Sequence, residues 1–169
     1  MRIGVLALQG AFAEHVVRLR ALGHDAVEIR SARDLAGAEG LVLPGGESTA
    51  QARLLSDTLA AALDALWRDG APILATCAGA ILAARRGWLD ADLARNAYGP
   101  QLHSAEAIAG DGTPLVLIRA PRFTRLGAEV EVLARLGDDP VLVRQRRLVA
   151  ATFHPELTDD PRVHALAFG

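Results

Sequence analysis

The sequence predicts an α/β domain in which a mostly parallel sheet carries helices on both faces and the second half is richer in strands. Two observations lead to this fold class. Short, wholly apolar runs such as residues 40–43 have the composition of strands that are buried on both faces. These runs alternate with segments of helical spacing through the first half of the chain, which is the element order of a parallel sheet with crossover helices.

The first half supplies four predicted strands and four predicted helices. The strands are residues 3–8, 26–29, 40–43 and 72–75. The helices are residues 12–22, a short helix from Ser31 to Leu35, residues 50–67, and a helix through Ala84 that follows the turn at 76–79. In a sheet of this kind the carboxyl ends of the parallel strands lie at one edge, where ligands bind.

The second half is predicted to contain more strand. Residues 88–101 are expected to be irregular, residues 115–118 and 130–133 to be strands, residues 141–144 and 148–153 a hairpin, and residues 161–168 a last helix. No linker divides the chain, so residues 1–169 are expected to be one domain.

Composition limits the classes of function. The net charge of -2 predicts no general affinity for nucleic acid or acidic membranes. The apolar stretch of residues 71–84 is shorter than the roughly 20 residues of a membrane-spanning helix. The single cysteine cannot form an internal disulfide, and no export signal is visible, so we expect a cytoplasmic protein.

That cysteine, Cys77, lies where a predicted strand turns into a helix. The positive end of the helix dipole stabilises a thiolate there, and the backbone N–H groups of the turn, such as that of Ala78, can hold an oxyanion. Small residues, including Gly79, suit a strained turn. The alternative is a buried structural cysteine, which is the commoner role of free cysteines.

Three other polar segments follow predicted strands, so four strand ends converge on one edge of the sheet. They are residues 9–10, residues 45–48 and residues 154–156. If the chain stays extended through Pro155, His154 and Glu156 point to the same face. A cysteine and a histidine oriented by an acid suit acyl transfer through a thioester. Taken singly, His154 could be an ordinary loop histidine and Glu156 a carboxylate placed for a helix dipole.

The turn at Pro44-Gly45-Gly46 has two interpretations. It could be an ordinary turn, or the bare backbone of Gly46 could bring its N–H close to a substrate carbonyl. The spacing of the glycines is not that of a nucleotide phosphate loop.

Six motifs together resemble a known family. They are residues 4–11 (GVLALQGA), 43–49 (LPGGEST), 76–79 (TCAG), 95–99 (RNAYG), 118–121 (IRAP) and 154–158 (HPELT). The chain resembles the triad-type glutamine amidotransferases nearly from end to end, and within them the glutaminase subunits of pyridoxal 5'-phosphate synthases. It departs from the usual pattern at Pro100, where arginine is common, and at Ala75, where glycine is common.

The resemblance implies a flavodoxin-like fold and the hydrolysis of L-glutamine to L-glutamate and ammonia, without cofactor or metal. It implies a catalytic triad of Cys77, His154 and Glu156. It implies that the glutamine is held by Gly46, Glu47, Ser48, Arg95, Ile118 and Arg119, and that oxyanion stabilisation and activation depend on Gly46, Ala78, Gln9 and Gly10. The ammonia would pass to a synthase subunit in a hetero-oligomer.

Some alternatives stay open at this point. Arg95 and Glu47 are the natural partners for the carboxylate and ammonium of a free amino acid, but the residues alone do not say which group each holds. Arg119 could instead be a surface residue. The chain could also be a catalytically silent, partner-binding relative, or a cysteine hydrolase of the same fold with another substrate.

Overall fold

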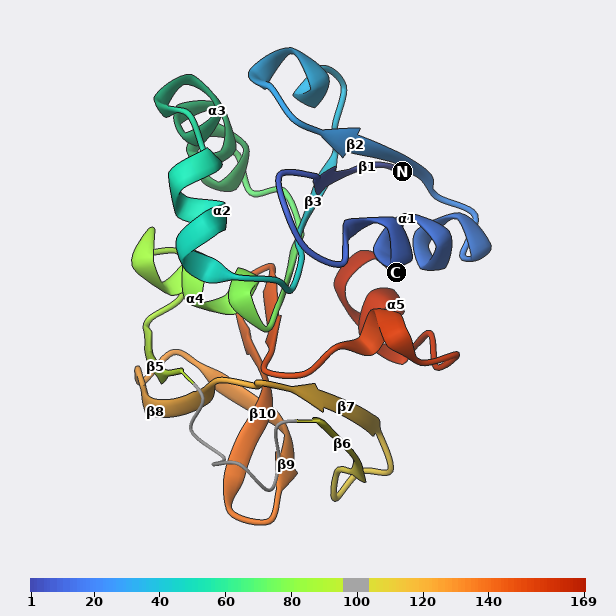
Figure 1. Cartoon of the computed structure of the whole chain (residues 1–169), viewed down its shortest axis with the longest axis vertical. Helices are drawn as coiled ribbons and strands as arrows, with labels where there is room; N and C mark the ends of the chain where they lie inside the picture. Colours follow the sequence, from blue (N-terminus) through green and yellow to red (C-terminus); the bar gives the residue numbers. More distant parts are fainter. Residues whose placement is uncertain (96–103) are drawn as a thin grey trace.

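The computed structural model describes residues 1–95 and 104–169, and its centre is a seven-stranded sheet (Figure 1). The strands, in spatial order, are β2 (Asp25–Ile29), β1 (Arg2–Leu6), β3 (Gly40–Leu43), β4 (Ile73–Thr76), β11 (Leu148–Ala151), β10 (Asp139–Gln145) and β9 (Glu131–Leu136). The first five pair in parallel, and β10 and β9 add to them antiparallel. The predicted mostly parallel sheet is therefore confirmed.

Helices cover both faces of this sheet. They are α1 (Phe12–Ala21), η1 (Ala32–Leu35), α2 (Ser48–Leu54), α3 (Asp57–Arg68), α4 (Ala78–Arg85), η3 (Pro155–Leu157) and α5 (Arg162–Phe168). Figure 1 shows α1 and α5 together on one side of the sheet, with α2, α3 and α4 on the other. Along β3, Val42 packs into the cluster that contains α1 and α5, whereas Leu41 and Leu43 pack into the cluster that contains α3 and α4. Burial on both faces explains the unbroken apolar runs of the strands.

The predicted helix over residues 50–67 was wrong in one respect, because the chain forms two helices there. The backbone of Leu55 is extended, and Ser56 starts α3 by accepting a hydrogen bond from the N–H of Leu59 at 3.3 Å. Ser56 satisfies one of the N–H groups that the start of a helix leaves open. An apolar stripe alone does not reveal such a break.

Two small two-stranded sheets complete the second half. β5 (Ala91–Ala94) pairs with β8 (Arg122–Leu126), and β6 (Ser104–Ile108) pairs with β7 (Pro114–Ile118), both antiparallel. The prediction that residues 88–101 are irregular was wrong for β5. Residues 96–101 of that predicted segment, including Pro100, lie outside the described residues. The strand predicted at 115–118 is confirmed as β7.

No helix within residues 1–95 and 104–169 combines the length and the apolar character that crossing a membrane requires.

Candidate active site

Cys77 occupies the sharp turn between β4 and α4. Its φ of 48° and ψ of −107° lie in a region that residues with a side chain rarely adopt, and its N–H donates to the carbonyl of Ala151 at 2.8 Å. Gly79, in the first turn of α4, allows this close packing, because a Cβ there would overlap the carbonyl oxygen of Leu43. The strand–turn–helix predicted around the cysteine is therefore present, and the strain falls on the one residue with a thiol.

His154 and Glu156 follow β11 and are held together at the same edge of the sheet. His154 Nδ1 lies 2.7 Å from Glu156 Oε1, and both side chains are buried. The expected extended path through Pro155 was wrong, because residues 155–157 form the 3₁₀ helix η3. A proline at the first helical position favours such a turn, which brings the two side chains together by a different route.

The charge state of His154 is set by opposing effects. Burial disfavours the imidazolium, but hydrogen bonds to Cys77 and Glu156 and the negative charge of both partners outweigh it and raise the pKa of His154 to about 10. The protonated ring thus faces the sulfur on one side and a carboxylate on the other. A histidine between a cysteine and a carboxylate is the arrangement of a nucleophile, its base and the group that orients the base.

Gly45 fits between the histidine and the cysteine, and the sequence analysis missed it. A Cβ at this position would overlap His154 Cε1, and it would lie 2.8 Å from His154 Nδ1 and 3.3 Å from Cys77 Cβ. The prediction had singled out Gly46 for its bare backbone. The sequence did hold a signal for Gly45, because two consecutive glycines are more than a turn with one flexible residue requires. The second glycine indicates that another group approaches the backbone closely.

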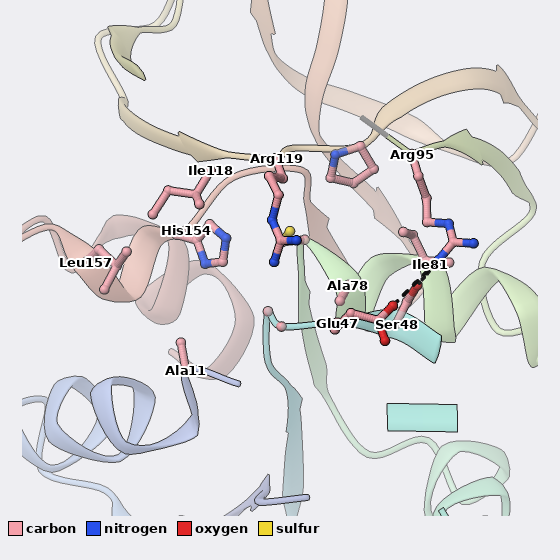
Figure 2. A pocket seen from close by; sticks show the side chains of 14 residues that line it. Ala11, Glu47, Ser48, Ala78, Ile81, Arg95, Ile118, Arg119, His154 and Leu157 are labelled. Atoms are coloured by element: carbon pink, nitrogen blue, oxygen red, sulfur yellow. Dashed lines mark hydrogen bonds and ion pairs between the residues drawn. The ribbon is translucent and has the colours of Figure 1, made fainter. Parts of the chain in front are cut away.

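A cavity of about 260 Å³ opens in front of Cys77 and His154 (Figure 2). It lies below the roughly 300–1,000 Å³ of sites for drug-sized ligands, so it suits a small metabolite. Nine residues of the predicted site line it, namely Gly46, Glu47, Ser48, Cys77, Ala78, Arg95, Ile118, Arg119 and His154, whereas Gln9, Gly10 and Glu156 do not. Arg119 is exposed, has a φ of 46°, and stands at the cavity between His154 and Arg95 in Figure 2.

One anion and one cation stand next to each other at the far side of the cavity. Arg95 Nη1 lies 3.2 Å from Ser48 Oγ, 3.0 Å from Thr49 Oγ1 and 3.6 Å from Glu47 Oε1. The Glu47 carboxylate also caps α2 by accepting from the N–H groups of Thr49 and Ala50. These backbone hydrogen bonds, the Thr49 one first, lower the pKa of Glu47, so its negative charge is secured.

The turn after β1 supports the cavity from below. The side-chain oxygen of Gln9 accepts from the N–H of Glu47 at 2.7 Å, and the N–H of Ala11 donates to the carbonyl of Gly45 at 3.1 Å. Gly10, with a φ of 98°, must be glycine because a Cβ would overlap that same carbonyl. Gln9 and Gly10 thus fix the orientation of the loop after β3.

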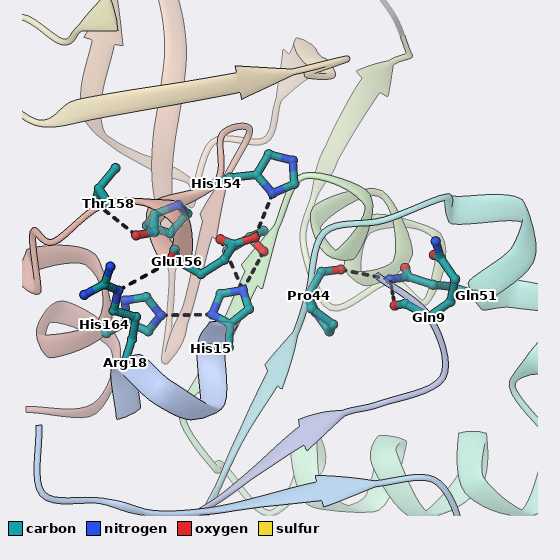
Figure 3. A network of polar contacts seen from close by, with 11 residues as sticks. Gln9, His15, Arg18, Pro44, Gln51, His154, Glu156, Thr158 and His164 are labelled. Carbon is teal, nitrogen blue, oxygen red and sulfur yellow. Dashed lines mark hydrogen bonds and ion pairs between the residues drawn. The ribbon is translucent and has the colours of Figure 1, made fainter. Parts of the chain in front are cut away.

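Gln51 of α2 is a second residue that the sequence analysis missed. Its Nε2 donates to the carbonyl of Pro44 at 2.9 Å and to that of Gln9 at 3.3 Å (Figure 3), so it ties the turn after β1 to the loop after β3. A glutamine inside a helix carries no sequence signal for this role.

Two buried histidines lie behind Glu156, on the side away from the cavity (Figure 3). His15 Nε2 lies 3.3 Å from Glu156 Oε2 and 3.1 Å from Thr76 Oγ1, and His15 Nδ1 lies 2.9 Å from His164 Nε2. Burial is the largest cause that lowers the pKa of both rings, well below the usual value for His15 and to about 4 for His164. Both rings are therefore neutral at pH 7.

We expect the free energy of unfolding to fall as the pH drops from about 6.5 to 4. Unfolded His164 takes up a proton near pH 6.5, whereas the folded ring refuses it down to about pH 4. The stabilisation that comes from the neutral His164 ring is fully present above pH 6.5. Between pH 6.5 and pH 4 it decreases by about 1.4 kcal/mol for each pH unit of acidification, or about 3 kcal/mol in all. Urea unfolding at pH 7.5, 5.5 and 4.5 measures it. His164→Gln, which cannot titrate, should show a flatter dependence; an identical dependence in both proteins would contradict the assignment.

Comparison with known proteins shows the family of the chain. The SNO glutamine amidotransferase family matches residues 5–168, so the chain belongs to that family of glutamine amidotransferases. A solved structure described as a glutamine amidotransferase superposes with a TM-score of 0.91, at 45% identity, over 98% of this chain and 96% of its own. The expected family and fold are thereby confirmed.

The curated relatives are more specific. The chain is 49% identical, over 96% of its length and 93% of the relative's, to the pyridoxal 5'-phosphate synthase subunit PdxT of Thermus thermophilus. It is 44% identical, over 97% and 96%, to the PdxT of Thermotoga neapolitana. A chain in the structure of PurLQS from Thermotoga maritima shares the fold, with a TM-score of 0.73 at 17% identity over 96% of this chain and 91% of its own.

Proposed function

We propose that this glutamine amidotransferase hydrolyses L-glutamine with a triad of Cys77, His154 and Glu156, and that it delivers the ammonia to the synthase subunit of a pyridoxal 5'-phosphate synthase. The observation that carries the proposal is the placement of His154. Its Nδ1 is 2.7 Å from Glu156, and its ring adjoins Gly45 and the strained cysteine beside a cavity of small-metabolite size. The names of the relatives support the partner.

The chemistry follows from these three side chains. The Cys77 sulfur attacks the side-chain amide carbon of glutamine, forming a C–S bond and a tetrahedral oxyanion. The C–N bond then breaks as His154 gives its Nε2 proton to the departing ammonia, leaving a thioester. Water attacks the thioester while His154 takes a proton from it, and breakage of the C–S bond releases glutamate. Glu156 holds the Nδ1–H of His154 throughout and stabilises the imidazolium.

The oxyanion would be held by the backbone N–H groups of Gly46 and Ala78, which both line the cavity. Removing one such donor typically costs about 2.7–4 kcal/mol of transition-state stabilisation. The loop that carries Gly46 is held by the turn after β1, because the Glu47 N–H donates to the side-chain oxygen of Gln9 and the Gly45 carbonyl accepts from the N–H of Ala11. A partner that shifts the turn after β1 would therefore change the rate, which allows ammonia release to depend on docking.

The two ends of the substrate would meet opposite charges. Arg95 is placed to bind the carboxylate of glutamine and Glu47 its ammonium, with Ser48 between them and Ile118 and Arg119 closing the other wall. Arg95 would exchange its hydrogen bonds to the hydroxyls of Ser48 and Thr49 for an ion pair with the carboxylate, in which donor and acceptor are both charged. We also propose that the protein acts in the cytoplasm, where a reducing environment keeps its single thiol free.

The test is a glutamine-dependent ammonia assay on the full chain with and without its synthase partner, once the two have been co-purified. We expect glutamate and ammonia in equal amounts and a higher rate when the synthase is present. Labelling of Cys77 by a glutamine-analogue electrophile, with protection by glutamine, identifies the substrate. Absence of ammonia release with the partner bound would instead indicate a silent, partner-binding relative, and labelling that glutamine does not prevent would indicate another substrate.

A further inference from the structure

One buried ring contacts the site from behind and has no part in the mechanism above. His15, on α1, lies with its Nε2 3.1 Å from Thr76 Oγ1 and 3.3 Å from Glu156 Oε2. Thr76 immediately precedes Cys77, and Glu156 holds His154, so His15 touches the neighbours of both the nucleophile and the base. The described residues that line the cavity do not include His15, so it does not contact the substrate.

The Glu156 carboxylate needs this contact. Its Oε1 accepts from His154, but its Oε2 is fully buried and makes no well-aligned hydrogen bond to any residue in the described ranges. A buried carboxylate oxygen without compensation is costly. His15 Nε2 is the polar group that the structure sets beside it (Figure 3).

The hydrogen-bond pattern fixes which nitrogen of His15 carries the proton. With a proton on His164 Nε2, this group donates to His15 Nδ1, and the proton of His15 must then be on Nε2, facing Thr76 and Glu156. In the opposite pattern His15 Nδ1 carries the proton and donates to His164 Nε2, so that His15 Nε2 turns a lone pair toward the carboxylate. This pattern would also leave a buried N–H on His164 Nδ1, which has no hydrogen-bond partner among the described residues. The first pattern leaves only an unpaired acceptor there, the more tolerable defect.

We propose that His15 is a positioning residue: its Nε2–H, set by His164 and hydrogen-bonded to Thr76, also presents its positive end to Glu156 Oε2 and thereby keeps Glu156 in the orientation that orders the His154 ring toward Cys77. The proposal rests on the proposed triad. The chain of contacts runs from α5 through α1 to η3 and ends at the nucleophile, so helices on the far side of the sheet set the geometry of the reacting groups. The nearby cation Arg18 of α1 does not take the place of His15 at the Glu156 carboxylate. Its guanidinium donates to the backbone carbonyl of Glu156 and pairs with Asp159.

A pair of amide variants tests this directly. In His15→Gln the side-chain N–H reaches the place of the imidazole Nε2, whereas in His15→Asn it falls one methylene short. With the synthase present, we expect His15→Asn to lower kcat by about 10–100-fold with KM for glutamine changed less than about 3-fold. His15→Gln should keep kcat within about 5-fold of the unchanged protein. Equal kcat values for the two variants, or a loss expressed in KM, would overturn the proposal.

A spectroscopic measurement separates this inference from the proposed function. The proton that His154 Nδ1 shares with Glu156 should give a low-field NMR signal in the unchanged protein and in His15→Gln, displaced or absent in His15→Asn. If the unchanged protein makes no ammonia, the proposed function fails while this signal still decides the role of His15. A signal that is the same in all three proteins would refute that role. Should His15→Asn not fold, His164→Gln and His164→Asn form the equivalent pair one contact further away, judged by the same signal and kcat.

Discussion

Replacing Cys77 with alanine should lower kcat for glutamine hydrolysis by at least about 10⁴-fold in the presence of the synthase subunit. Loss of a nucleophile that works as part of a triad removes nearly the whole contribution of the triad, because the remaining groups have nothing to activate. Ammonia release by the purified complex measures the effect. The cavity and its charged residues remain, so glutamine should still bind, and calorimetry can detect that binding.

Alanine is the suitable replacement because it keeps a Cβ at the strained turn, so the backbone bears the same cost as before. The melting temperature of Cys77→Ala should therefore stay close to that of the unchanged protein, and the variant should still co-purify with the synthase. If a folded Cys77→Ala complex released ammonia at more than about one hundredth of the original rate, Cys77 would not be the nucleophile.

Gly45→Ala should be nearly as damaging although it adds one methyl group and removes no reactive atom. The new Cβ would overlap His154 Cε1 and come within 2.8 Å of Nδ1, so the ring has to move away from Glu156, Cys77 or both. A displacement of about 1 Å in a catalytic group costs on the order of 10²-fold in rate. We expect kcat to fall by about 10²–10³-fold, and the reactivity of Cys77 toward a glutamine-analogue electrophile to fall with it.

Gly110→Ala is the matched control. A Cβ at Gly110 meets only the carbonyl of Arg135 at 3.9 Å, an ordinary contact distance, so activity and stability should not change. The comparison isolates crowding at the histidine from the general effect of adding a methyl group. A Gly45→Ala protein with the kcat of the Gly110→Ala protein would show that the loop yields without disturbing His154.

Much of the fold could be predicted because its strands are buried on both faces. The runs at 40–43 and 72–75 are apolar throughout, and no other common element has that composition between helices. The strand β8 was missed because most of its residues are exposed or half-buried. Only Phe123 is buried along it, and its partner β5 is some thirty residues away, so neither alternation nor a local turn reveals the pair.

The site was predictable where chemistry demands rare residue types at strand ends, as for Cys77 and His154. It was not predictable where a role depends on segments that meet only in the folded chain. His15 reads as one position of an amphipathic helix, and its contacts come from β4, η3 and α5. Glu156 was correctly paired with His154, but through a 3₁₀ turn and not an extended strand, since spacing by two fits either geometry.

The backbone of Cys77 has a consequence for how such a protein can change. A residue with a side chain at φ 48° and ψ −107° costs on the order of 1–3 kcal/mol, and glycine would release most of it. A substitution of Cys77 by glycine would therefore raise thermal stability and remove the nucleophile at the same time. A library screened only for survival at high temperature would accumulate well-folded proteins that have lost the thiol, so any effort to harden this enzyme has to select for ammonia release at the same time.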